Sequence, residues 1–193
     1  MIHFIEKELS KLAVLVADIQ ADKALLNQVA TCAQIIVETL HNGGKVLIAG
    51  NGGSAADAQH IAGEFVSRFH YDRPGLAAIA LTTDTSILTA IGNDYGYERL
   101  FSRQVQALGR EGDVFIGIST SGNSANVVAA FKEAQQLKLK TIGFTGAAGG
   151  KMVDLCDITL RMPSLETPKI QEGHIAIGHI ICGLVEAAIF PRN

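Results

Sequence analysis

The sequence predicts an α/β fold, a three-layer sandwich of flavodoxin-like type with a five-stranded parallel sheet at its centre. Short, continuous apolar runs alternate with segments of helical periodicity, which is typical of parallel strands joined by helical crossovers. Hydrophobic residues make up 48% of the 193 positions, enough for one sizeable core. We therefore expect a single domain over residues 1–193.

Two helices are expected before the sheet, within residues 1–42. Apolar residues recur three and four positions apart from Ile5 to Leu40, with a break around residues 21–23. The turn at residues 42–44, Asn-Gly-Gly, ends the second helix. This pattern predicts an N-terminal helical hairpin.

The segments interpreted as strands are short and apolar throughout, without the alternation of a half-exposed sheet. This character predicts that helices cover both faces of the sheet. The segments are residues 46–49, 77–81, 114–118, 141–144 and 158–160.

A long C-terminal helix is expected from Lys169 to about Ile189, after Pro168 and before Pro191. Apolar residues cover much of its circumference. Together with the two N-terminal helices, it has more apolar surface than one side of a small sheet can cover. We therefore expect a homo-oligomer in which residues 1–42 contribute to the subunit contacts.

Charge and composition exclude several classes of partner. The formal net charge is −3 and no basic face is apparent, so nucleic acid and anionic membranes are not expected partners. Charged residues are interleaved through residues 1–20, which is unlike a signal peptide or a membrane span, so a cytoplasmic location is expected. Cys32, Cys156 and Cys182 lack CxxC spacing and are interpreted as buried, inert thiols.

Two expected loops carry the residue types that bind phosphate. Each follows a strand and precedes a helix, where free N–H groups and hydroxyls suit a dianion. The same residue types also serve merely as helix caps and turns, an alternative that two such loops in one small sheet disfavour. The substrate-binding candidates are Asn51, Gly52, Gly53 and Ser54 in the first loop and Ser119, Thr120, Ser121 and Ser124 in the second, with Gln171 of the last expected helix as a further candidate.

A candidate metal or acid–base set lies on two of the expected helices. His60 and Glu64 are four residues apart and share one helix face, and Gln171 and His179 lie about 12 Å apart along the last helix. Two imidazoles, a carboxylate and an amide oxygen suit zinc or a similar divalent ion. Glu172 and His174 remain alternative contributors. Taken singly, a His and a Glu four residues apart commonly form a surface pair, and a His in a long apolar helix is commonly a hydrogen-bonded core residue.

Four motifs together resemble the sugar isomerase (SIS) domain family, and within it the isomerases of seven-carbon sugar phosphates. The resemblance covers nearly the whole chain and keeps the motifs in order. The motifs are Gly50-Asn51-Gly52-Gly53-Ser54-Ala55-Ala56-Asp57-Ala58-Gln59-His60, Gly92-Asn93-Asp94, Gly117-Ile118-Ser119-Thr120-Ser121-Gly122-Asn123-Ser124 and Ile170-Gln171-Glu172.

The resemblance implies interconversion of sedoheptulose 7-phosphate and D-glycero-D-manno-heptose 7-phosphate, for bacterial surface polysaccharides, by a homotetramer with sites at its subunit interfaces. It implies that the second loop holds the phosphate and that Asn51, Ser54 and Asp94 contact the sugar. The implied zinc ligands are His60, Glu64, Gln171 and His179.

Aldose–ketose isomerisation needs a base to move a proton between adjacent carbons and a group that stabilises the enediolate. Glu64 is the candidate base and His179 its acid partner.

One position departs from the family pattern: Lys169 stands where the family generally has Arg, which keeps the charge but not the planar guanidinium.

Two further interpretations belong to other functional classes. Non-enzymatic relatives of this fold bind the bacterial replication initiator, and the chain resembles them around residues 80–90 and 184–191. Those relatives lack residues suited to metal or acid–base work at the positions of Glu64 and His179, both of which are present here. A sugar-phosphate-sensing transcription regulator would need a DNA-reading domain, and the N-terminal helices have no basic face.

Overall fold

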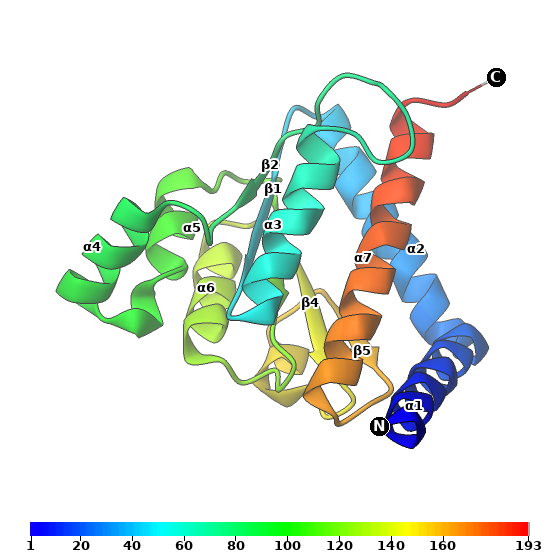
Figure 1. Cartoon of the computed structure of the whole chain (residues 1–193). Coiled ribbons are helices and arrows are strands. Elements are labelled where there is room, and N and C mark those ends of the chain that lie inside the picture. The colour runs from blue at the N-terminus through cyan, green and yellow to red at the C-terminus, as the bar shows by residue number, and fades with distance from the viewer. Residues whose placement is uncertain (193) are drawn as a thin grey trace.

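A computed structural model describes residues 1–192 (Figure 1). Its sheet has five strands in the order β2-β1-β3-β4-β5, and every neighbouring pair is parallel. The predicted strands are all present, each within two residues of its expected ends. The strands are β1 (Val46–Gly50), β2 (Ala78–Ala80), β3 (Val114–Ile118), β4 (Lys140–Gly146) and β5 (Ile158–Met162).

Helices cover both faces of the sheet and complete the predicted three layers. Helices α2 (Lys23–His41), α3 (Gly53–Val66) and α7 (Thr167–Ile189) pack on one face, and α5 (Ser102–Leu108) and α6 (Ala125–Gln136) lie on the other. Alternate strand residues therefore belong to different cores: Ile48 and Ile116 face α3 and α7, whereas Leu47 and Phe115 face α6. All four are at most 1% exposed, which is why the strands lack polar alternation.

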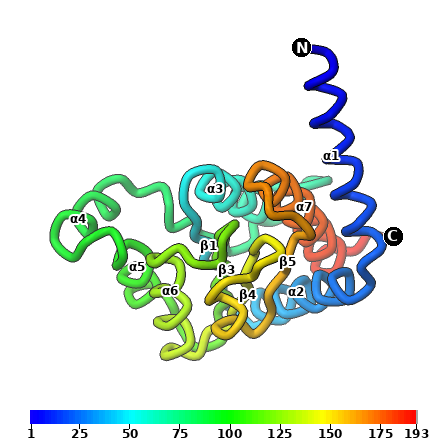
Figure 2. Tube along the Cα trace, turned by 90° about the horizontal axis from the view of Figure 1, so that it is seen from below, coloured from blue at the N-terminus to red at the C-terminus, as the bar shows by residue number. Residues whose placement is uncertain are grey.

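The first helix, α1 (Ile2–Ala21), is joined to α2 by Asp22 alone. Asp22 caps α2 by accepting the N–H of Leu25 at 3.0 Å. Figure 2 shows α1 leaving the body of the molecule instead of folding back along α2. The expected N-terminal helices are thus present, but they form an open elbow because most of α1 has nothing to pack against within one chain.

A lobe between β2 and β3 contains α4 (Thr85–Tyr95), the 3-10 turn η1 (Tyr97–Arg99) and α5. Figure 1 shows α4 at the far edge of this lobe, away from α7 and α2. A second 3-10 turn, η2 (Gly150–Asp154), connects β4 to β5. The lobe places η1 near the carboxyl end of β1, as the contacts of Tyr97 described below demonstrate.

The strand order creates a position where ligands of such sheets bind. The chain leaves β1 toward β2 on one side and enters β3 on the other, so the loops after β1 and β3 diverge to opposite faces. Gly50 pairs with Ile118, so these two strands end side by side. The two predicted phosphate loops therefore meet at this point of the sheet.

Helix α7 is long and apolar enough to cross a membrane, judged by its length and composition alone. It is also a packed helix of this fold, because 44% of its most apolar window is buried inside the molecule. It contacts α2, α3, β4 and β5. Core helices of soluble proteins commonly have the same length and composition, so these properties of α7 are weak evidence for a membrane span.

Candidate active site and metal centre

The loop after β3 gathers hydroxyl groups at the start of α6. Ser119 Oγ lies 2.8 Å from Ser124 Oγ and 3.4 Å from Ser121 Oγ. Thr120 and Ser121 line a pocket of about 280 Å³ at the same edge of the sheet. Gly122 has φ +65°, and a Cβ there would run into the Gly149 carbonyl. The four predicted phosphate contacts therefore lie together, in a turn that requires glycine.

Side-chain amides join this loop to the loop after β1. The Asn51 and Asn126 side chains exchange two hydrogen bonds of 2.9 Å, and the Tyr97 hydroxyl donates to Asn51 Oδ1 at 2.9 Å. Gly52 has φ +57° and Ser54, in the first turn of α3, is buried. Asn126 and Tyr97 were not among the predicted site residues, because their relation to Asn51 exists only once β1 and β3 are adjacent.

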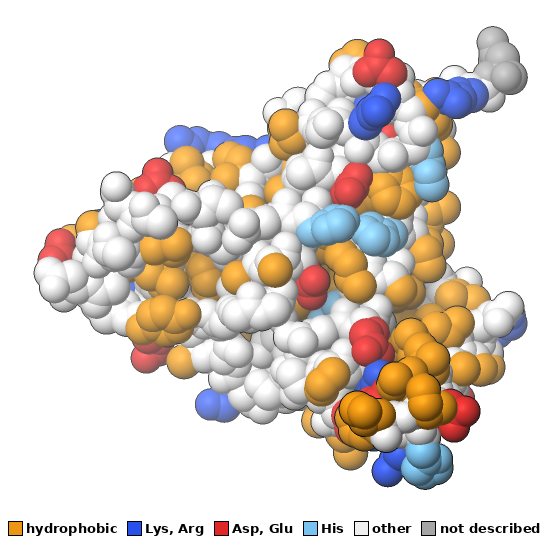
Figure 3. All heavy atoms as spheres, viewed as in Figure 1, with side chains coloured by type: hydrophobic (Ala, Val, Ile, Leu, Met, Phe, Trp, Pro, Cys, Tyr) orange, Lys and Arg blue, Asp and Glu red, His pale blue; other side chains and the backbone are white. Residues whose placement is uncertain are grey.

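His60, Glu64 and His179 come together where α3 packs against α7. His60 Nε2 lies 2.9 Å from His179 Nε2 and 3.2 Å from Glu64 Oε1. Figure 3 shows histidine side chains at the surface where α3 and α7 meet, with acidic side chains on either side of them. The His60 side chain is 48% exposed and that of Glu64 24% exposed, so the cluster is accessible to solvent.

These three side chains fit a divalent ion. Their ligand atoms all lie within 4.8 Å of one another, and they are the one such group of His, Cys, Asp and Glu found among the described residues. Nitrogen and oxygen ligands of zinc, each at about 2.0–2.2 Å, lie roughly 3–4 Å apart. The observed separations match this arrangement, and two imidazoles with one carboxylate are ligands that a borderline ion such as zinc accepts.

Gln171, the fourth predicted ligand, lies at the start of α3, next to the first loop. Its side-chain amide packs against Gly53, where an added Cβ would come within 2.6 Å of Gln171 Nε2. Gly53 begins α3, and His60 follows it by seven residues, about 10 Å along the helix axis. The structure thus groups Gln171 with the first loop, and its role as a ligand stays a prediction.

Comparison with known proteins places this geometry in a family. A model of the SIS domain matches residues 10–146. The chain belongs to the SIS domain family. It is 63% identical over 190 residues to a phosphoheptose isomerase from Burkholderia pseudomallei strain K96243, covering 98% of this chain and 96% of the relative.

Other relatives agree on the branch of the SIS family. A phosphoheptose isomerase from Aneurinibacillus thermoaerophilus is 65% identical over 175 residues, covering 91% of this chain and 88% of the relative. The structure of phosphoheptose isomerase GmhA from Neisseria gonorrhoeae superposes with a TM-score of 0.86 at 46% identity, covering 95% of this chain and 99% of that one. The resemblance drawn from the motifs is confirmed, as is the fold.

Asp57 is a polar residue near His60 and His179 that was not among the predicted site residues. It precedes His60 by three residues and shares its face of α3. Asp57 Oδ2 is shielded from solvent without a hydrogen-bond partner. Burial raises the pKa of this carboxyl, and the imidazoles of His60 and His179 oppose that shift. The i, i+3 spacing to His60 was the sequence signal that could have identified it.

Asp94, expected to contact the sugar, lies in the α4 lobe of this SIS domain. It lines a pocket of about 300 Å³ together with Tyr95 and Arg103, and it accepts a hydrogen bond from Asn93 Nδ2 at 2.8 Å. Within one chain it is not grouped with the two loops, although Tyr97 from the same lobe reaches Asn51. Its contact with substrate stays a prediction.

The two alternative metal contributors have other partners. His174 is fully buried, and its Nε2 donates to the Thr145 carbonyl at 3.1 Å. Burial lowers the pKa of His174 to about 4, so the ring is neutral. Glu172 accepts a hydrogen bond from Lys169 at 2.9 Å. Neither side chain joins the metal-ligand cluster.

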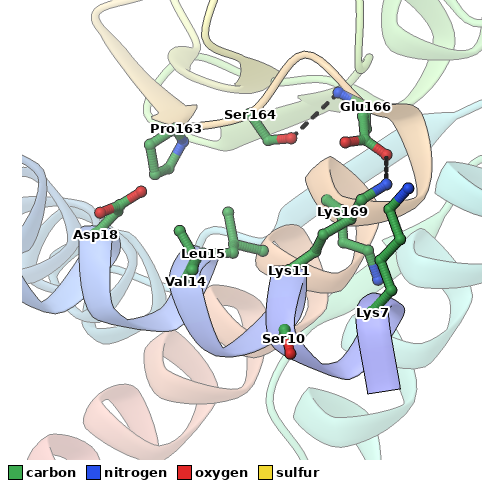
Figure 4. Close-up of a pocket in the computed structure, with 10 residues that line it drawn as sticks. All are labelled: Lys7, Ser10, Lys11, Val14, Leu15, Asp18, Pro163, Ser164, Glu166 and Lys169. Atoms are coloured by element: carbon green, nitrogen blue, oxygen red, sulfur yellow. Dashed lines mark hydrogen bonds and ion pairs between the residues drawn. The ribbon is translucent and has the colours of Figure 1, made fainter. Parts of the chain in front are cut away.

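Lys169, the departure from the family pattern, belongs to an ion-pair network around a separate pocket. Figure 4 shows this pocket, about 370 Å³, between α1 and the segment that leads into α7. Lys169 Nζ lies 3.4 Å from Glu8 Oε2, and Lys11 Nζ bonds Glu166 Oε2 at 2.7 Å. The ammonium group of Lys169 therefore connects α1 to the start of α7, two residues before Gln171, at a position where the family generally has the guanidinium of an arginine.

The three cysteines carry free thiols. None forms a disulfide, and Cys32 and Cys182 are buried while Cys156 is partly buried. Burial raises the pKa of each thiol to about 12. Thiols with such values are protonated at neutral pH and are poor nucleophiles and metal ligands.

Proposed function

We propose that this chain interconverts D-sedoheptulose 7-phosphate and D-glycero-D-manno-heptose 7-phosphate, as a metal-dependent isomerase of bacterial heptose biosynthesis. The observation that carries this proposal is the convergence of His60, Glu64 and His179 on α3 and α7, where α3 is the helix that follows the first of the two hydroxyl- and glycine-rich loops. The high identity to phosphoheptose isomerases over nearly the whole chain supports the same substrate class.

The substrate phosphate is proposed to bind the loop after β3. Ser119, Thr120, Ser121 and Ser124 supply hydroxyl donors, and the N-terminus of α6 supplies a positive helix end. This arrangement binds a dianion without a lysine or arginine. The sugar would then extend past Asn51 and Ser54 toward the metal-ligand cluster on α3 and α7.

The metal site is proposed to consist of His60, Glu64, Gln171 and His179. A bound divalent ion, taken here to be zinc, would supply electrophilic stabilisation to the carbonyl and hydroxyl oxygens of the reacting carbons. Gln171 would have to approach the other three from the start of α3. A substrate bound between them would bring these elements together.

Proton transfer is assigned to Glu64 and His179. Glu64 removes a proton from C1 of the ketose, the C–H electron pair forms the C1–C2 double bond, and His179 protonates the C2 oxygen. The reverse sequence on the neighbouring carbon completes the reaction: the C1 hydroxyl loses its proton to His179, and Glu64 returns its proton to C2. No oxidant or reductant is needed, because the two carbons exchange oxidation states.

The assembly is proposed to be a homotetramer. Exposed apolar residues on α1 and α7 support subunit contacts, among them Leu9 at 60% and Ile180 at 49% exposure. The initiator-binding adaptor has less support, since Glu64 and His179, whose chemistry those relatives are expected to lack, are both present in the metal-ligand cluster. A partner other than sugar phosphate is not required to explain these residues.

A direct assay tests the proposal. Purified protein, with and without a chelator, is incubated with sedoheptulose 7-phosphate, and aldoheptose phosphate is followed by NMR. Conversion that the chelator abolishes and zinc restores is the expected result. If folded, zinc-loaded protein gives no conversion, the isomerase assignment is wrong, and binding to the replication initiator becomes the next function to test.

A further inference from the structure

Glu186 lies fully buried near the end of α7, in a helix that is otherwise mostly apolar. Its Oε1 accepts hydrogen bonds from the Phe69 N–H at 2.9 Å and from Arg73 Nε at 3.0 Å, and its Oε2 accepts the His70 N–H at 2.7 Å. Burial alone would raise the pKa of this carboxyl, but these donors hold it below its ordinary value. Glu186 is therefore an ionised group bound by the loop after α3, residues 67–77.

Arg73 connects this carboxylate to the C-terminal end of α3. Its guanidinium donates to the backbone carbonyls of Phe65 at 2.6 Å, Glu64 at 2.7 Å and Ser67 at 3.1 Å. The last carbonyls of a helix have no partner within the helix and carry its negative dipole end, so a buried cation suits them. One side chain thus closes the end of α3 and joins it to α7.

The loop held by Glu186 also reaches the metal-ligand cluster. The Phe69 ring centroid lies 5.5 Å from that of His179 and 4.2 Å from that of His70. Gly183, four residues after His179, leaves room for this contact, since a Cβ there would come within 3.3 Å of the Phe69 ring. Phe69 therefore packs against the imidazole of His179, a member of the metal-ligand cluster.

The metal-ligand cluster depends on the placement of two helices. His60 and Glu64 belong to α3 and His179 to α7, so the three meet only at one relative position of these helices. We propose that Glu186 is a positioning residue for the metal centre, which fixes the end of α3 to α7 through Arg73 and orients His179 through Phe69. This inference rests on the proposed function and adds a residue that contacts neither metal nor sugar.

Three variants separate this role from general stability. Glu186→Gln keeps the shape of the side chain but removes its charge, and Phe69→Ala removes the packing on His179 while leaving the ion pair. Asp113→Asn is the matched control: Asp113 is 3% exposed and pairs with Lys45 Nζ at 2.6 Å. That pair lies where β1 and β3 begin, at the opposite edge of the sheet from the loops that follow these strands.

Each protein is freed of metal and titrated with Co²⁺ in competition with a chelator, and its visible absorption and thermal midpoint are recorded. We expect Glu186→Gln and Asp113→Asn each to lower the midpoint by about 10 °C. Of these two variants, only Glu186→Gln should also weaken Co²⁺ binding, by about 10- to 100-fold, and shift the absorption bands. Phe69→Ala should weaken binding about 10-fold with a smaller change in midpoint.

Equal Co²⁺ affinities and spectra in Glu186→Gln and Asp113→Asn would overturn the proposal. If Glu186→Gln does not fold, wild-type affinity in Phe69→Ala overturns it instead. Failure of the unaltered chain to bind Co²⁺ is a distinct result, which would refute the metal-dependent function and this inference with it.

Discussion

At the scale of single residues, the assignment of Glu64 as the base makes the sharpest prediction. Glu64→Gln keeps a similar shape and an oxygen ligand but cannot accept a proton, so turnover should fall about 10²- to 10⁴-fold. Steady-state kinetics at saturating metal, with metal content measured on the same samples, provide the test. Glu111→Gln, at a side chain that is 71% exposed, should keep full activity. Near-normal turnover in a metal-loaded Glu64→Gln enzyme would exclude Glu64 as the base.

His174 predicts how stability depends on pH. Its pKa is about 4 in the folded chain against 6.5 ordinarily, because the ring is buried. Below pH 6.5 the unfolded chain binds a proton at His174 that the folded chain does not, so the contribution of His174 lowers the free energy of unfolding as pH drops toward 4, and this contribution then levels off. The shift corresponds to about 3 kcal/mol over that window.

The control for this prediction is His174→Gln, which can still donate to the Thr145 carbonyl but does not titrate. Urea unfolding of metal-free protein at several pH values between 7 and 4 measures the free energy of unfolding of both chains. The variant should lose about 3 kcal/mol less than the unaltered chain over this range. Parallel curves would mean that His174 is not the group responsible.

At the scale of helices and loops, the meeting of α3 and α7 can be tested at Gly53. A Cβ there would displace the Gln171 amide, while the backbone of the first helical turn accepts alanine. Gly53→Ala should therefore keep the fold and its thermal midpoint within a few degrees, yet lower activity about 100-fold, as displacement of a site residue by about 1 Å does.

Gly63→Ala is the matched control on the same helix. An added Cβ at Gly63 has nothing within 4 Å, so activity should be unchanged. Stability should rise by about 1 kcal/mol, because alanine is the better helix former. Equal activity of the two variants would show that the contact between Gly53 and Gln171 does not matter for turnover.

Elements with a strong periodic signal could be predicted from the sequence, and contacts between distant elements could not. The strands were predictable because both faces are covered, which leaves runs such as residues 114–118 without polar residues. His60 and Glu64 were predictable because four residues separate them on one helix. Arg73 and Glu186 are 113 positions apart, and only the packing of the loop after α3 on α7 brings them together.

The open arrangement of α1 and α2 also could not be predicted, because it depends on contacts between elements. The periodicity of α1 indicates an apolar face but not which surface covers it. Within one chain, α1 packs little against α2, and its buried residues are Leu15 and Ile19. The predicted hairpin assumed that the apolar face of α1 packs against the rest of the same chain, whereas most of this face is exposed to solvent in one chain.

At the scale of the whole molecule, that outward face predicts the oligomer. Ile2, Ile5, Leu9 and Val16 lie along one stripe of α1, and each is at least 50% exposed. Full burial of such side chains stabilises an association by roughly 1.5–3 kcal/mol each. For the proposed homotetramer, light scattering should give a mass near four times the chain's 20.4 kDa.

Leu9→Asp tests whether the α1 stripe holds the oligomer together. It places a charge in the middle of the stripe, where desolvation would oppose association, so the mass at micromolar concentration should fall. Ser10→Asp adds the same charge on another side of α1 and should keep the oligomer. If both variants keep the unaltered mass, the stripe is not a subunit contact and α7 becomes the surface to test. If Leu9→Asp dissociates and also loses activity while it stays folded, the site is incomplete in one chain, which would explain why Asp94 stands apart from the loops.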